Sequence, residues 1–221
     1  MSFHPDITML QAYACGEVDA VTGLMVATHL ETCPECQNAV AHIESAQAQN
    51  VFEPSSEPLA EIDFNDMLEQ VLDSQIRSDA REVYDRRFVT VKNRRFILPQ
   101  TLSRYADLVA DWRSYGGKVY SAPIDFGEEA RVNLMYISEG VQIPQHTHKG
   151  LEATLVLHGS FSDEDGEYEA GDFLLRDASV KHSPRTKADA DCLCLTVLTE
   201  PMVFTQGVAR IFNMFGRGMY P

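Results

Sequence analysis

The hydrophobic pattern of this 221-residue chain changes once, near residue 106. Before that point, apolar residues recur every three or four positions, as they do along one face of an amphipathic helix. After it come short apolar stretches rich in β-branched residues, separated by turn-forming residues, as in an antiparallel sandwich or barrel. The sequence therefore predicts a two-domain α + β chain, with a small helical N-terminal domain and a C-terminal antiparallel β-sandwich or barrel.

Three helices are predicted near the N-terminus from their start and stop signals. Asp6 can open a first helix that ends at about Cys15. Asp19 can cap a second helix that runs to His29, and Pro34 suits the first position of a third. The early part of the chain is therefore expected to be a compact group of helices joined by short turns.

A fourth amphipathic helix is predicted over about residues 60–86, after a stretch that contains two prolines. Its apolar residues recur at steps of three and four: Phe64, Met67, Leu68, Val71, Leu72, Ile76, Ala80, Val83 and Tyr84. We assign residues 1–86 to the four-helix domain, 87–105 to a linker and 106–200 to the β domain, and leave 201–221 as an unassigned C-terminal tail. Strands are expected within the stretches 118–124, 130–137, 151–157 and 192–198.

Charge divides the chain in a similar way. Residues 1–76 contain 13 acidic residues and no lysine or arginine, whereas residues 77–221 contain 20 acidic and 18 basic residues. An acidic field of this kind repels nucleic acid and anionic membranes and favours a basic protein partner. The alternative is an acidic surface that serves solubility alone. We expect no direct binding to nucleic acid or to a membrane.

The location of the protein can be inferred from what the sequence lacks. It contains no apolar run near the roughly 18 residues that a membrane-spanning helix needs, and its first residues do not read as a secretory signal. Its five cysteines are grouped in a way that suits metal binding or redox chemistry better than a secreted disulfide framework. These features predict a cytoplasmic protein.

The stretch T-H-L-E-T-C-P-E-C contains three residues that can bind a soft metal ion, His29, Cys33 and Cys36. If Pro34 begins a helix, both thiols lie at its N-terminus, where the helix dipole favours the thiolate form that binds metal. A C-x-x-C pair without metal is the alternative, because one such pair is a weak signal.

A tetrahedral site would need one more ligand, and the spacing of the residues leaves three candidates. His4 stands just before the first helix, Cys15 near its end, and His42 within the third helix. Cys15 would give a site with three thiols, whereas either histidine would give two thiols and two imidazoles. Physical reasoning from the spacing alone does not choose among them.

A second group of candidate ligands lies in the β region. His146 and His148 are separated by one residue, so on a strand both side chains face the same way. Glu152 follows four residues after His148, and His182 comes after a later turn, giving a nitrogen and oxygen ligand set that suits zinc, iron, manganese or nickel. His158 has the same parity but lies beside a turn glycine, and we interpret it as a rim residue. A barrel without metal is the alternative.

Cys192 and Cys194 are also separated by one residue and share one face of a late strand. A bond between them would close a strained ring, so a stable structural disulfide is not expected. They are either two small residues that fill the core or a thiol pair that is oxidised near the metal. The sequence does not place them relative to the metal site.

Two resemblances narrow these alternatives. The residues H-P-D followed by Y-x-x-G and then H-L-E-T-C-P-E-C resemble the zinc-binding anti-sigma domain of bacterial regulators. In that family an N-terminal histidine joins the His-x-x-x-Cys-x-x-Cys group, which implies zinc at His4, His29, Cys33 and Cys36. Cys15 is then expected to be a small buried side chain.

The second resemblance is to the cupin family. The first cupin motif matches at Gly140, His146, His148, Glu152 and Gly159. The second motif is partial: Gly171 and His182 are present, but Asp177, Ser179 and Thr186 replace the usual Pro, Gly and Asn. The resemblance implies a second divalent metal at His146, His148, Glu152 and His182, with zinc as the expected ion, while the departures leave the turn geometry open.

A zinc anti-sigma domain followed by a cupin is similar to the ChrR-type anti-sigma factors over nearly the whole chain. That resemblance implies a regulator, not an enzyme, that holds an extracytoplasmic-function sigma factor and releases it on an oxidative signal such as singlet oxygen. Two alternatives belong to other classes. The cupin could be a dioxygenase-like metalloenzyme, or the first domain could be a thiol-based redox sensor that loses zinc when Cys33 and Cys36 oxidise.

Overall fold

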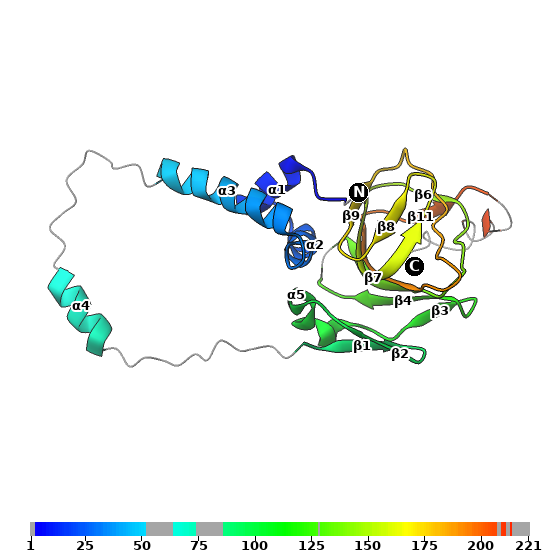
Figure 1. The fold of residues 1–221 in the computed structure, drawn as a ribbon, viewed down its shortest axis with the longest axis horizontal. Helices are drawn as coiled ribbons and strands as arrows, with labels where there is room; N and C mark the ends of the chain where they lie inside the picture. Colours follow the sequence, from blue (N-terminus) through cyan, green and yellow to red (C-terminus); the bar gives the residue numbers. More distant parts are fainter. Residues whose placement is uncertain are drawn as a thin grey trace.

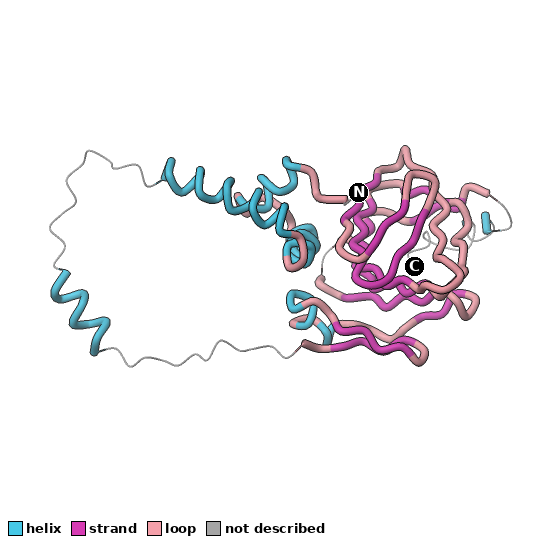
Figure 2. The backbone as a smooth tube through the Cα atoms, in the orientation of Figure 1, coloured by secondary structure: helices cyan, strands magenta, loops and turns pink. Residues whose placement is uncertain are grey.

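The structure is a computed structural model that describes residues 3–51, 64–73, 86–127, 129–206, 209–210 and 213. Helices gather at one end of the molecule and a β domain of curved, antiparallel strands occupies the other (Figure 1; Figure 2). The two classes of secondary structure are separated along the chain as the hydrophobic pattern predicts. In the described part of the chain, no helix has the length and apolarity needed to cross a membrane.

The first three helices begin where the sequence predicts. Helix α1 spans Ile7–Ala14, α2 spans Ala20–Leu30 and α3 spans Pro34–Val51. The side chains of Asp6 and Asp19 accept hydrogen bonds from backbone amides in the first turns of α1 and α2, which satisfies donors that no helical carbonyl can reach. Helix α3 starts at a proline, which needs no amide partner at that position.

Helix α4 spans Phe64–Asp73 and lies within the predicted range 60–86; residues 60–63 and 74–85 fall outside the described residues, and residue 86 is not helical. It lies well apart from α1–α3 (Figure 1). Its apolar residues at helical spacing are more than half exposed: Met67, Leu68, Val71 and Leu72. This helix therefore presents an apolar stripe to its surroundings.

The segment 87–105, expected to be a linker, is instead folded. It forms a hairpin of strands β1 (Phe88–Val91) and β2 (Arg94–Ile97), followed by the short helix α5 (Gln100–Ser103); the 3-10 helix η1 (Ala106–Leu108) comes next. Its apolar residues join the core of the β domain: Val89, Val91, Phe96, Leu98 and Leu102. The linker prediction was wrong because strands of four residues, one of them starting with two arginines, are too short to show a clear alternation.

The main sheet has the strand order β3-β4-β5-β10-β7-β8, and β9 also pairs with β7. Its strands are β3 (Arg113–Tyr115), β4 (Val119–Ile124), β5 (Arg131–Ile137), β7 (Glu152–Ser162), β8 (Glu167–Glu169), β9 (Phe173–Arg176) and β10 (Cys192–Leu198). A second pair joins β6 (His146–His148) to β11 (Met202–Phe204). Strand β11 thus gives a structure to part of the tail that the sequence left unassigned.

Helix α2 packs on both parts of the molecule. On one side Val26 belongs to a small helical core with Leu10 and Val40. On the other side its buried residues are part of the large core of the β domain: Val21, Leu24 and Met25. Each such side chain contributes about 1.5–3 kcal/mol by its burial, so α2 holds the helical part against the hairpin and α5.

A polar contact strengthens the same junction. The carboxylate of Glu31, at the C-terminal end of α2, accepts hydrogen bonds from the backbone amides of Gln100 (2.8 Å) and Thr101 (2.5 Å). These amides open α5 and have no helical acceptor of their own, so the carboxylate serves as their cap. The helical part and the β domain are therefore joined by both apolar and polar contacts.

Replacing Gly159 with alanine is expected to destabilise the fold by at least about 3 kcal/mol. Gly159 has a φ of +71°, and a Cβ there would lie 1.9 Å from the carbonyl oxygen of Asp191. Gly127 is a matched control, because its φ is +72° but a Cβ would meet nothing within 4 Å. Urea unfolding should show a loss of only about 1–2 kcal/mol for Gly127→Ala. Equal losses for the two variants would contradict the close approach at Gly159.

Candidate metal centres

The first candidate centre brings together His4, His29, Cys33 and Cys36. One ligand atom from each lies within 4.8 Å of all the others. His29 Nε2 is 3.4 Å from the sulfur of Cys36, and His4 Nδ1 is 3.3 Å and 3.5 Å from the sulfurs of Cys33 and Cys36. Metal–ligand bonds of about 2.0–2.3 Å in a tetrahedron separate ligand atoms by about 3.3–3.8 Å. The four side chains therefore have the spacing of a tetrahedral metal site.

Local structure explains how the four residues meet. His29 lies in the last turn of α2, and Cys33 and Cys36 lie at the start of α3 after a turn of only a few residues. The backbone amide of Cys36 points to the sulfur of Cys33 at 3.4 Å, as expected at a helix N-terminus. His4 comes from the segment before α1, and its Nδ1 lies near both sulfurs.

The chemistry of these side chains fits a bound cation. Burial lowers the pKa of His29, which keeps its imidazole neutral and able to coordinate. Burial, together with the hydrogen bond and charge of Cys33, raises the pKa of Cys36 to about 12. A divalent cation between the two sulfurs would stabilise their thiolate forms. The cluster thus suggests a metal site in the N-terminal part of the chain.

The other two candidates for the fourth ligand lie elsewhere. Cys15 is exposed and its sulfur accepts a hydrogen bond from Gln47, so the expectation that it is buried was wrong. His42 is exposed on α3. Glu35 lies 3.5 Å from Nε2 of His4, where it can orient that imidazole without entering the cluster.

The second candidate centre lies inside the β domain. His146 and His148 come from β6 and point to the same side, and His182 pairs with His146 through two backbone hydrogen bonds of 3.1 Å. Ligand atoms of these three histidines lie within 4.8 Å of one another. Glu152, at the start of β7, places Oε2 at 3.1 Å from His148 Nε2 and 3.5 Å from His182 Nε2. The structure therefore brings the four predicted residues together.

Several atoms of this cluster lack a hydrogen bond of acceptable geometry. His148 Nε2, Glu152 Oε2 and His182 Nε2 are all buried and unpaired in this sense. Buried polar atoms without partners are rare, because leaving one unsatisfied is unfavourable by about 1–3 kcal/mol. Three such atoms that face one another would be satisfied by one cation, so the residues present fit a divalent metal.

Burial and neighbouring groups shift the pKa values of His146 and Glu152 in this cluster. Burial and the neighbouring His182 lower the pKa of His146 to about 4. Burial alone would raise the pKa of Glu152, but the adjacent His148 and the other two histidines outweigh it and lower the pKa to about 2. At neutral pH Glu152 therefore offers an anionic oxygen and His146 a nitrogen lone pair, and the nitrogens of His148 and His182 lie beside them.

The departures from the second cupin motif are compensated locally. Asp177 accepts a hydrogen bond from the backbone amide of Ser179 at 2.9 Å, which forms an Asx turn where the motif prefers other residues. The hydroxyl of Thr186 donates to the carbonyl of Ser138 and accepts from the amide of Val141. These bonds hold the segment that carries His182.

His158 does not face the cluster. The pairing of β10 with β7 shifts register between Leu193 and Cys194, so the alternation along β7 is interrupted before His158. Its ring instead lies 5.0 Å from that of Phe96, and Nε2 is 3.7 Å from Asp191. The sequence interpretation of His158 as outside the ligand set agrees with this placement, but the reason is the bulge.

Cys192 and Cys194 are buried in the core with Val156, Phe161 and Leu174. Their sulfurs lie 3.4 Å apart. The hydrogen bond with Cys192 and the burial of the site raise the pKa of Cys194 well above its ordinary value, so its thiol is protonated at neutral pH. The packing role that the sequence allowed is therefore observed, and a protonated thiol is a poor nucleophile.

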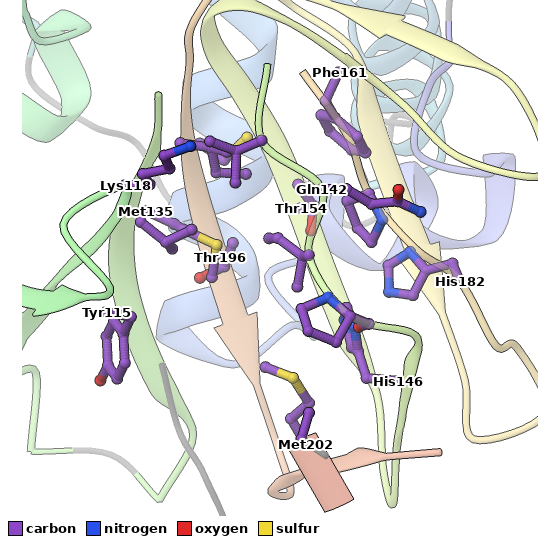
Figure 3. Close-up of a pocket in the computed structure, with 18 of the residues that line it drawn as sticks. Tyr115, Lys118, Met135, Gln142, His146, Thr154, Phe161, His182, Thr196 and Met202 are labelled. Atoms are coloured by element: carbon purple, nitrogen blue, oxygen red, sulfur yellow. The ribbon is translucent and has the colours of Figure 1, made fainter. Parts of the chain in front are cut away.

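A cavity of about 640 Å³ adjoins the second cluster. His146, Glu152 and His182 form part of its wall, and Cys194 is also part of the lining. Figure 3 shows His146 and His182 facing a space that Met135, Phe161 and Met202 also surround. The cluster is therefore reached through a largely apolar chamber.

Sequence reasoning missed two groups that support the histidines. Asp163 lies 3.2 Å from Nδ1 of His182, and the carbonyl oxygen of Gly171 lies 2.8 Å from Nδ1 of His29. Asp163 belongs to an acidic turn that has no distinctive spacing to the ligands. Every residue has a backbone carbonyl, so the residue type at position 171 does not indicate this role. Only the folded structure shows that the Gly171 carbonyl contacts His29.

Comparison with known proteins gives matches to one family over both parts of the chain. The model of the ChrR Cupin-like domain family matches residues 107–201. The Anti-sigma-E factor ChrR of Cereibacter sphaeroides is 32% identical over 219 residues, which is 97% of each protein. A chain in the crystal structure of Rhodobacter sphaeroides SigE in complex with the anti-sigma ChrR is 28% identical, with a TM-score of 0.64 over 89% of this chain and 98% of that one.

A looser likeness is found to an RmlC-like cupin protein from Ralstonia eutropha, which is 19% identical with a TM-score of 0.40 over 43% of this chain and 67% of that one. The likeness to ChrR, by contrast, extends over both the helical and the β parts. With 32% identity over 97% of its length, this chain belongs to the ChrR family of anti-sigma factors.

Proposed function

We propose that this chain binds and inhibits an extracytoplasmic-function sigma factor through its N-terminal helices and releases it when the cupin domain senses an oxidative signal such as singlet oxygen. The observation that carries the proposal is the match over nearly the full chain to ChrR, whose crystal structure is a complex with SigE. A sigma factor acts on RNA polymerase, so the proposed location is the cytoplasm.

The N-terminal cluster supports zinc as the metal of this domain. Two thiolates and two imidazoles at tetrahedral spacing are a donor set typical of structural zinc sites. His4, His29, Cys33 and Cys36 would hold the ion, which would fix the start of α1, the end of α2 and the start of α3 relative to one another. These residues thus set the arrangement of helices that faces the sigma factor.

Charge and shape support a protein partner for the same region. Residues 1–76 carry 13 acidic residues and no lysine or arginine, which complements a basic surface and gives no attraction to nucleic acid. The apolar stripe of α4 is suited to a groove in a partner, since anchors at helical spacing are the usual mode of helix-in-groove binding. Both features favour binding to a sigma factor over binding to DNA.

Replacing Leu68 with aspartate is expected to weaken sigma binding by at least about tenfold, because it places a charge in the apolar stripe. Leu68 is 55% exposed in the free protein, so the substitution should leave its fold intact. Glu69→Gln on the same helix is the matched control and should bind within about twofold of wild type. Titration calorimetry with the purified sigma factor would measure both. Unchanged binding by Leu68→Asp would exclude α4 from the interface.

The cupin cluster supports a second divalent metal, for which we propose zinc. His146, His148, Glu152 and His182 would hold it, and it would satisfy their unpaired atoms. The adjoining cavity would give a small oxidised or oxidising molecule access to the centre. Because the thiol of Cys194 is held protonated, the metal cluster is a better candidate sensor than the cysteine pair.

Two other functions are separated from this one by simple measurements. A dioxygenase-like enzyme is compatible with the cavity and the His and Glu cluster, but would consume oxygen together with a substrate. A redox sensor based on Cys33 and Cys36 would lose zinc at mild peroxide doses that leave the cupin intact. We propose a regulator and not an enzyme, because the matched relative is an anti-sigma factor over its whole length.

The proposal is tested by purifying the tagged full-length chain from its native cells. We expect one sigma factor to accompany it, with about one zinc ion in the N-terminal domain. The purified complex should block transcription from that sigma factor's promoters in vitro until an oxidant is added. A pure chain with zinc but no sigma factor, and with no effect on transcription, would overturn the proposal.

A further inference from the structure

The turn between β8 and β9 contacts the N-terminal cluster directly. Nδ1 of His29 lies 2.8 Å from the carbonyl oxygen of Gly171 in this turn. An imidazole that donates through one nitrogen is fixed in tautomer and orientation, so that the other nitrogen is free to coordinate. The β domain therefore supplies a group that orients a ligand of the helical domain.

The same turn also holds the residue next to His4. The backbone amide of Phe3 donates to Asp172 at 3.0 Å, and the amide of Phe173 donates to the carbonyl of Phe3 at 2.9 Å. The N-terminal segment thus lies along the β8–β9 turn, as it does in Figure 1. This one turn thus contacts His29 directly and holds Phe3, the residue next to His4.

The other end of β8 leads to the cupin cluster. The ring of Tyr168 packs edge-on against Phe3 with 4.8 Å between ring centroids. Its hydroxyl donates to Asp163 at 3.0 Å, and the other oxygen of Asp163 lies 3.2 Å from Nδ1 of His182. Arg176 donates to both Asp163 and the hydroxyl of Tyr168. One continuous set of contacts therefore runs from His182 to Phe3, whose peptide bond leads to His4.

The groups that make these contacts are held in place, because they are buried and include a carboxylate bonded to an arginine. The side chain of Asp163 is fully buried and Tyr168 is 1% exposed. Asp163 accepts hydrogen bonds from both Tyr168 and Arg176, so its carboxylate is held in one orientation against His182. Hydrogen bonds to a buried carboxylate are among the stronger ones in proteins. A change in the position of His182 is therefore expected to move Asp163 and, through it, Tyr168.

We propose that Asp163 and Tyr168 are positioning residues that couple the two metal centres, so that an occupied cupin cluster slows the release of metal from His4, His29, Cys33 and Cys36. This inference rests on the proposed function, because it requires both metal sites. The inference goes beyond the proposed function by naming the residues that connect the sensing centre to the sigma-binding domain. Linkage requires that the coupling act in both directions.

The test uses cobalt as a probe in the full-length protein. Only the N-terminal cluster has thiolate ligands, so the thiolate-to-cobalt absorption reports that site alone, and its decay on adding a chelator gives the release rate. His148→Ala, which removes one of the four cupin ligands, is expected to speed release by about fivefold or more. Tyr168→Phe keeps the ring on Phe3 but removes the hydroxyl, and should speed release in the same way.

A double-mutant cycle tests whether the two effects share one route. We expect His148→Ala combined with Tyr168→Phe to be no faster than the faster single variant. Tyr120→Phe is the matched control, because its hydroxyl donates only to Gly117 in an exposed turn; it should release at the wild-type rate. Phe3→Ala is a second variant on the same route, with faster release expected.

The outcomes are distinguishable. Release at the wild-type rate from His148→Ala, Tyr168→Phe and Phe3→Ala would overturn the coupling while leaving both metal sites in place. Independent, multiplicative effects of His148→Ala and Tyr168→Phe would overturn the assigned route. A wild-type protein without thiolate-to-cobalt absorption would refute the N-terminal metal site of the proposed function, and the coupling with it.

Discussion

Replacing Cys36 with serine is expected to remove zinc from the N-terminal cluster and to weaken sigma binding by more than about 100-fold. The serine oxygen is a poor zinc ligand, and only three of the four donors would remain. Cys36 is 2% exposed and touches the small core around Leu10, Val26 and Val40, so loss of the metal would also loosen the helices that it joins. Zinc content and titration calorimetry with the sigma factor would measure the two effects.

Cys15→Ser is the matched control, because Cys15 is exposed and lies outside the cluster. It should retain zinc and bind the sigma factor as the wild type does. His29→Ala should behave like Cys36→Ser, since it removes another ligand of the same site. Full repression by metal-free Cys36→Ser protein would refute the idea that zinc sets the sigma-binding arrangement.

The double replacement His146→Ala/His148→Ala is expected to preserve repression but to abolish release on exposure to singlet oxygen. Both histidines belong to the cupin cluster, which is a separate group from the N-terminal ligands. Structural zinc sites bind with about 10–16 kcal/mol, so a several-fold faster metal release would still leave the N-terminal site filled. A reporter driven by the sigma factor should remain silent in this strain both before and after the oxidant.

His158→Ala provides the comparison for that experiment. This histidine lies on β7 near the cluster in sequence but packs against Phe96, away from the ligands. Its replacement should leave release on oxidant exposure close to that of the wild type. Normal release by the His146→Ala/His148→Ala protein would show that the signal is received elsewhere in the chain.

The parts of the fold that sequence reasoning predicted are those with strong local signals. Asp6, Asp19 and Pro34 mark helix starts by side-chain chemistry that acts within one turn. The placement of His146 and His148 on one face follows from strand geometry alone. The sequence therefore predicts correctly those residues whose placement depends only on local backbone geometry.

The features that the sequence alone did not predict depend on contacts between distant parts of the chain. The choice of His4 over Cys15 and His42 came from a family resemblance, because the approach of the N-terminal segment depends on its pairing with the β8–β9 turn. The hairpin 88–97 was missed because its strands are short and its burial comes from the core it joins. The bulge that turns His158 outward has no marker in the residues beside it.

Helix α2 has one further consequence, for how such regulators can be recombined. Because Val21, Leu24 and Met25 belong to the core of the β domain while Val26 belongs to the helical core, the boundary between sensor and inhibitor runs through a single helix. A chimera that joins the helices of one family member to the cupin of another would mismatch this face unless α2 and its partners around α5 come from the same parent. The two halves are therefore expected to be inherited as one unit, and not exchanged as independent modules.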